Sequence, residues 1–104
     1  MGDDFQALLQ EDMAQLNGET AQVRWRELER FFAAGRLVHV ARGIDLVEAA
    51  ARMARDEVDW FVPLKDAGRV GQVSDDQARY WQSEDRLLWA VVVRPWILVQ
   101  EVDG

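Results

Sequence analysis

The stretch LLWAVVVRPWILVQEV, residues 87–102, decides the fold, and only Arg94 and Pro95 interrupt its apolar part. A strand with one wet face alternates apolar and polar residues. The runs LLWAVVV and WILV do not alternate, so they predict strands with both faces covered. Arg94 and Pro95 are too few for a crossover connection, which leaves an antiparallel hairpin or one long strand bent at the proline. We favour the hairpin.

The residues between the two runs disfavour the usual hairpin turns. Two-residue loops prefer positive φ angles, which arginine disfavours and proline cannot adopt. A cis Arg94–Pro95 peptide bond in a type VI turn would resolve this conflict. A longer loop that includes Val93 and Trp96 would resolve it as well.

The rest of the chain alternates helical and extended patterns. Strands are predicted at 20–24, 36–41 and 69–73, and helices at 3–16, 25–35, 43–61, 63–68 and 74–85. Gly35 is expected to end the second helix, and Ser74 with Gln77 has the spacing of a capping box. The helix that Asp45 begins is expected to continue past Asp56 and to kink or break at Pro63. Its predicted buried stripe is Val47, Ala50, Ala54, Val58 and Phe61.

Together these patterns predict an α+β fold in a single small domain, residues 1–104. The sheet is expected to be mixed, with about four to five short strands, and helices are expected to pack on it. It ends in the C-terminal β-hairpin. Residues 1–19 form an N-terminal helix and turn in this interpretation, and the length of 104 residues suits one hydrophobic core.

Composition excludes several classes of function. A formal net charge of -7, with 19 acidic and 12 basic residues, opposes binding to nucleic acid and to anionic membranes. The absence of cysteine excludes disulfides and thiolate chemistry, and it fits a reducing compartment. Neither a secretory signal nor a stretch long enough to span a membrane is evident. We therefore expect a cytoplasmic protein.

Catalytic side chains are scarce. His39 is the single histidine, and the two serines are Ser74 and Ser83, so no metal-binding histidine pair exists and no nucleophile is evident beside a base. The carboxylate clusters are interpreted as helix caps and helix ion pairs. We expect no catalytic residue, metal site or cofactor, although whether the protein is an enzyme stays open.

The C-terminal strands predict a partner. Covering both of their faces takes helices on each side, or helices on one side and a second subunit on the other. Because the predicted helices are few and short, we expect a noncatalytic protein-interaction or structural module that forms a homodimer. The expected interface residues are Trp89, Val91, Val93, Trp96, Ile97 and Val99. Coverage by the chain's own helices is the alternative.

A second hypothesis comes from the aromatic residues. The chain has five tryptophans, and three of them lie between residues 81 and 96. A small-molecule-binding protein or an enzyme would place an aromatic pocket near the C-terminal strands, where an arginine could bind an anionic ligand. The residues of that pocket would be Arg79, Trp81, Trp89, Arg94 and Trp96.

The block LWAVVVRPWILVQ occurs together with WRELERFFAAGRLVHV, DLVEAA and the AxxW pattern at 78–81. In these segments the chain resembles the uncharacterised bacterial proteins of domain-of-unknown-function family 2288, over residues 20–101. The resemblance implies a small stand-alone bacterial protein. It implies no activity, substrate or catalytic residue.

Overall fold

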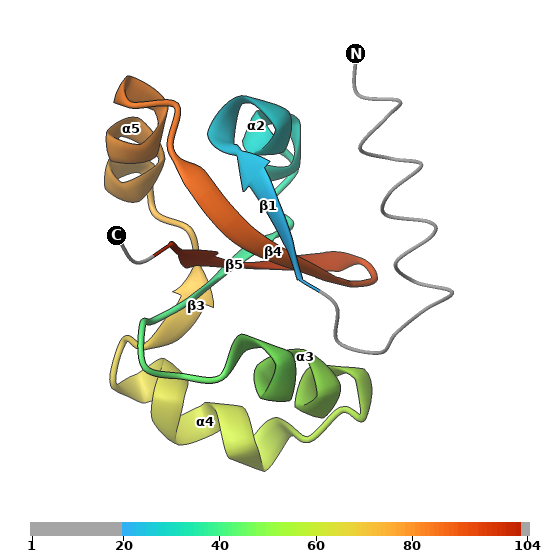
Figure 1. Ribbon diagram of the computed structural model, residues 1–104. Helices are drawn as coiled ribbons and strands as arrows, with labels where there is room; N and C mark the ends of the chain where they lie inside the picture. The colour runs from blue at the N-terminus through green and yellow to red at the C-terminus, as the bar shows by residue number, and fades with distance from the viewer. Residues whose placement is uncertain (1–19, 103–104) are drawn as a thin grey trace.

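The computed structural model describes residues 20–102, which form a mixed five-stranded sheet with helices on both of its faces (Figure 1). The strands are β1 (Ala21–Arg24), β2 (Leu37–Val40), β3 (Val70–Gln72), β4 (Leu87–Val93) and β5 (Trp96–Glu101). The helices are α2 (Trp25–Ala33), α3 (Leu46–Ala54), α4 (Val58–Asp66) and α5 (Asp75–Ser83). The predicted α+β fold is confirmed; the predicted helix over residues 3–16 lies outside the described residues.

The strand order is β1-β4-β5-β2-β3. β2 pairs with β5 in parallel, and the other neighbouring strands pair antiparallel. β4 and β5 form the predicted hairpin, in which Val93 pairs with Trp96, and the Arg94–Pro95 peptide bond is cis. The hairpin lies inside the sheet, with β1 and β3 at the edges, which explains why its strands are apolar on both faces.

Two helices cover each face of the sheet, so the domain has three layers (Figure 1). We call the two sides the α2/α5 face and the α3/α4 face. Alternate residues of β4 point to opposite sides, as a strand requires: Leu88 and Ala90 join the cluster on the α2/α5 face, whereas Val91 and Val93 join the one on the α3/α4 face. The chain's own helices thus cover both faces of the C-terminal strands.

Several predicted helix ends are confirmed. The Ser74 hydroxyl accepts a hydrogen bond from the Gln77 amide, and the Gln77 side chain accepts one from the Ser74 amide, both at 3.1 Å. The Asp45 carboxylate accepts from two amides in the first turn of α3, at 2.9 and 3.1 Å. Gly35 has a φ of 73°, the left-handed conformation expected after α2.

The prediction of one helix continuing past Asp56 is wrong. α3 ends at Ala54, Asp56 adopts a φ of 59°, and α4 then runs through Pro63 instead of breaking there. The Glu57 carboxylate accepts hydrogen bonds from Arg52 at 2.9 Å and from Arg55 at 2.7 Å. These bonds hold the turn after α3, while Arg52 also pairs with Glu48, four residues earlier, at 2.9 Å.

The break also changes which side chains are buried. It turns α4 so that Trp60, Phe61 and Leu64 pack against the α3/α4 cluster. Val58, which the predicted stripe placed inside, is exposed instead. Val47 and Ala54 are exposed as well, because α3 buries Leu46, Ala49 and Ala50. Within residues 20–102, no helix has the length and apolar character that crossing a membrane requires.

Candidate functional site

A groove of about 700 Å³ lies on the α3/α4 face, near the β4–β5 turn. Its floor comes from the sheet and its walls from α4 and the end of α3. The residues that line it are Val38, Met53, Asp56, Glu57, Val58, Phe61, Val62, Lys65, Val70, Gly71, Gln72 and Trp96.

The helix α4 supplies the apolar wall of this groove. Val58, Phe61, Val62 and Lys65 follow one another at spacings that place them on one side of a helix. Val58 is 58% exposed and Val62 is 48% exposed, although both are aliphatic. Trp96, at the start of β5, is only partly buried beside them. The groove therefore leaves apolar surface in contact with water.

Charged side chains lie toward the two ends of α4. Asp56 and Glu57 precede the helix, and Lys65 lies in its last turn. The hydrogen bond from the Arg55 guanidinium lowers the pKa of Glu57 below its ordinary value. The side chains of Asp56 and Lys65, by contrast, make no hydrogen bond or ion pair among the described residues. Within the described residues, the groove lining thus carries a carboxylate before α4 and an ammonium group in its last turn, neither of them in an ion pair.

The groove lining combines apolar side chains with three charged ones, Asp56, Glu57 and Lys65. The lining contains no histidine, serine or tyrosine. Across the part of the chain that the structure describes, no group of three or more potential ligands could hold a metal ion.

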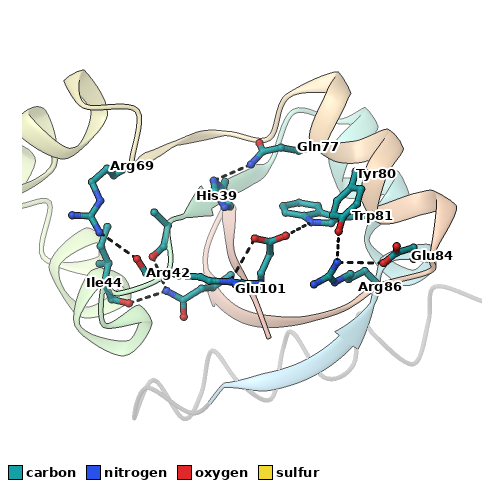
Figure 2. Close-up of polar contacts among 12 residues, drawn as sticks. His39, Arg42, Ile44, Arg69, Gln77, Tyr80, Trp81, Glu84, Arg86 and Glu101 are labelled. Carbon is teal, nitrogen blue, oxygen red and sulfur yellow. Dashed lines mark hydrogen bonds and ion pairs between the residues drawn. The ribbon is translucent and has the colours of Figure 1, made fainter. Parts of the chain in front are cut away.

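A polar cluster lies on the other side of the sheet, where α5 meets β2 and β5 (Figure 2). Gln77 Nε2 lies 3.1 Å from His39 Nδ1, and the Trp81 indole donates to the Glu101 carboxylate at 3.1 Å. Arg42 approaches the same carboxylate at 3.7 Å. Burial lowers the pKa of His39, and the negative charge of Glu101 opposes that shift in part.

This cluster connects α5, β2, β5 and the loop after β2. The Ser74 hydroxyl caps α5, and the Ser83 hydroxyl donates to the Tyr80 carbonyl at 2.8 Å, so both serines are engaged at the ends of that helix. The Gln100 amide donates to the carbonyls of Ala41 at 2.9 Å and Ile44 at 2.8 Å. The bonds hold the loop after β2 against β5 (Figure 2).

The structure corrects the six-residue interface expected from the sequence. Val91, Val93, Ile97 and Val99 are buried within the chain, because helices of the same chain cover both sides of the hairpin. These four side chains belong to the core of the single chain. The other two, Trp89 and Trp96, are only partly buried, and Trp96 lines the groove.

The five residues of the alternative aromatic pocket do not come together. Trp81 packs on the α2/α5 face, whereas Trp89 and Trp96 lie on the α3/α4 face, with the sheet between them. Arg79 pairs with Asp76 at 3.2 Å on the surface of α5. Arg94 lies in the β4–β5 turn. A pocket formed by all five is therefore excluded.

Sequence reasoning missed the groove because it placed Val58 and Phe61 inside one long helix. A signal was present: the segment VDWFVPL contains apolar residues around its whole circumference when it is helical. A helix that buries only one side needs apolar residues on that side alone. Val62 and Val58 are the apolar residues left over once Trp60 and Leu64 face the core.

The fold and the groove define a small α+β domain with a partly open apolar face. A family model described as "Protein of unknown function (DUF2288)" matches residues 11–101, so the chain belongs to this family. The chain is also similar to a solved structure, the solution NMR structure of PA1075 from Pseudomonas aeruginosa. The two share 39% sequence identity with a TM-score of 0.80, over 90% of this chain and 87% of that one. Of the curated proteins compared with the chain, none matches.

Proposed function

We propose that the protein is a noncatalytic interaction module that forms a homodimer through the groove on its α3/α4 face. The observation that carries this proposal is the exposure of Val58 and Val62 beside the partly buried Trp96, in a groove of about 700 Å³. We call these three side chains the groove surface. Contiguous apolar surface of this kind marks interaction sites in soluble proteins.

Burial energetics favour a protein partner. Completing the burial of a half-exposed valine contributes roughly 1 kcal/mol, at about 25 cal/mol per Å² of apolar area. A tryptophan at the same place adds a large rigid contact of the kind that anchors interfaces. The groove surface supplies half-exposed valines and a tryptophan, next to the sheet.

The second candidate function is the binding of a small molecule in the same groove. Its volume lies within the range of ligand pockets, which is roughly 300–1,000 Å³. Such pockets also carry a few polar groups that converge on the ligand. Here the unpaired charges of Asp56 and Lys65 lie toward opposite ends of α4, which fits an extended protein surface better.

Native mass spectrometry of the protein as purified separates the two candidates. We expect a species with twice the chain mass and no additional bound mass. A monomer at micromolar concentration would overturn the homodimer, and a small molecule retained in stoichiometric amount would favour the second candidate.

We also propose that the protein is cytoplasmic. The lack of cysteine supports this location, because it fits a reducing compartment.

Charge substitutions test whether the groove surface is the interface. The double variant Val58→Glu, Val62→Glu should sediment as a monomer, because dimerisation would bury two carboxylates against apolar groups. Val47→Glu is the matched control: Val47 is 40% exposed on α3 and does not line the groove. This control should remain a dimer, and circular dichroism should show all variants folded. Equal dimerisation by the double variant would place the interface elsewhere.

A further inference from the structure

The groove borders the edge of the sheet that β3 forms, and within residues 20–102 no further strand pairs with that edge. β3 is the last strand in the order, and its residues Val70, Gly71 and Gln72 line the groove. An edge strand presents backbone amides and carbonyls that can pair with another chain. The groove surface and this edge are therefore parts of one continuous region.

The register of β3 shows which backbone groups face outward. Ala41 N donates to Arg69 O at 2.8 Å, and Val73 N donates to Leu37 O at 3.3 Å, in line with the pairing of His39 with Gly71. Hydrogen-bonded and non-bonded pairs alternate in an antiparallel ladder. Gly71 therefore bonds to β2, whereas the residues on either side of it direct their N–H and C=O groups away from the sheet.

We infer that two copies of the chain join edge to edge through β3, antiparallel, with a two-fold axis at Gly71. This inference rests on the homodimer proposed above and specifies how it forms. Val70 of each chain faces the partner's Gln72, and each such pair exchanges two backbone hydrogen bonds. The sheets of the two copies become one continuous sheet.

The charges along α4 fit this symmetry. A two-fold axis perpendicular to the sheet places α4 and the partner's α4 on the same side, running in opposite directions. Lys65 then faces the end of the partner's helix that carries an unpaired carboxylate, at the partner's Asp56. Each chain supplies one member of both ion pairs, so the surface is complementary to itself.

The opposite edge of the sheet suits this role less well. Trp25 N donates to Arg86 O at 2.9 Å, so Gln22 and Arg24 direct their backbone groups outward from β1. Both of their side chains are exposed, and a charged side chain on an edge strand opposes pairing with another chain. The groove does not reach β1.

A proline at position 72 tests the edge pairing directly. Gln72→Pro removes an N–H that points away from the sheet, a position where edge strands accept proline. We expect the dimer to dissociate about tenfold more readily or more, as measured by sedimentation equilibrium. Gln72→Ala is the matched control. It loses the side-chain bond to the Gly35 carbonyl but keeps the amide, so it should dimerise like the unmodified chain.

A cysteine at the axis gives a second test that does not depend on the proline variant folding. A Cβ added at Gly71 meets nothing within 4 Å, and the chain contains no cysteine of its own. The two Cα atoms at the axis would lie about 4.5 Å apart, within the range that a disulfide spans. Gly71→Cys should form a disulfide-linked dimer under mild oxidation, whereas Gln22→Cys, on the other edge, should not.

The outcomes distinguish the two proposals. A dimer that survives Gln72→Pro, or a Gly71→Cys dimer that does not cross-link, overturns the edge pairing. If the double variant at Val58 and Val62 still dissociates that dimer, the groove remains the interface. A monomeric unmodified chain overturns both proposals.

Discussion

The side chains on the two faces of the sheet are buried to different degrees. On the α2/α5 face, Trp25, Leu28 and Trp81 are each no more than 2% exposed. On the α3/α4 face, α4 contains no buried residue, and its aromatic side chains are only partly covered. One layer of the domain seals the core, and the other leaves apolar side chains at its surface. Val58 and Val62 are the exposed aliphatic residues of α4, and on this difference between the faces rests our proposal that the α3/α4 face binds a partner.

The helices themselves show the same contrast. α5 begins with a complete capping box. The residue before α4, Glu57, makes no side-chain cap bond, and Pro63 within the helix removes one backbone hydrogen bond. α4 therefore depends on its packing and on the turn that precedes it more than on its own helical stability.

The largest expected effect comes from removing one tryptophan from each face. Trp81→Ala should lower the free energy of unfolding by about 3–5 kcal/mol, because it leaves a cavity in a sealed core and the Glu101 carboxylate loses its indole donor. Trp96→Ala should cost about half as much, because water already reaches part of that side chain. Urea unfolding followed by circular dichroism measures both at equal protein concentration. Equal losses would contradict the contrast between the faces.

Part of this architecture can be predicted from the sequence. The unbroken apolar runs on both sides of Arg94 and Pro95 predict a doubly covered hairpin, and the alternation in β2 assigns Val38 and Val40 to one side. The capping boxes are local patterns, which is why the end at Ser74 is correct. These features depend on residues that are close together in the sequence, and backbone geometry determines their local structure.

The features that the sequence did not predict depend on competition between arrangements of similar energy. Charged residues four apart favoured one long helix, but the chain turns at Asp56, and Glu57 then pairs with both Arg52 and Arg55. Strand order is set by contacts distant in sequence. The sequence also did not reveal that four helices of nine residues suffice to cover both faces. For this reason four predicted interface residues proved to be core.

The contrast between α5 and α4 predicts a smaller effect. Ser74→Ala should lower the free energy of unfolding by about 0.5–2 kcal/mol, because the Gln77 amide loses its acceptor and the capping box opens. Glu57→Ala should change stability less, since Glu57 is not a side-chain cap and its ion pairs are exposed to solvent. Chemical denaturation of both variants measures the difference. A greater loss for Glu57→Ala would mean that the turn before α4 matters more than the cap of α5.

The smallest expected effect is a pH dependence from His39, on the α2/α5 side of the sheet. Its pKa lies below the ordinary value of 6.5 because burial disfavours the charged imidazole. The unfolded chain therefore binds a proton more readily than the folded chain as the pH falls below 6.5, so the free energy of unfolding decreases there. Above 6.5 both states are neutral and the contribution of His39 is complete. His39→Gln should remove this slope in unfolding curves measured from pH 8 downward.

Glu101 sharpens this test because its negative charge raises the pKa of His39 and so opposes the effect of burial. Glu101→Gln keeps an oxygen that can accept from the Trp81 indole but removes the charge. The pKa of His39 should then fall further, and the range of pH over which stability is lost should extend to lower values. NMR titration of the imidazole in the folded variant measures the pKa directly. An unchanged or raised pKa would show that solvent, and not Glu101, sets the electrostatic environment of His39, and that this part of the α2/α5 face is less sealed than its tryptophans.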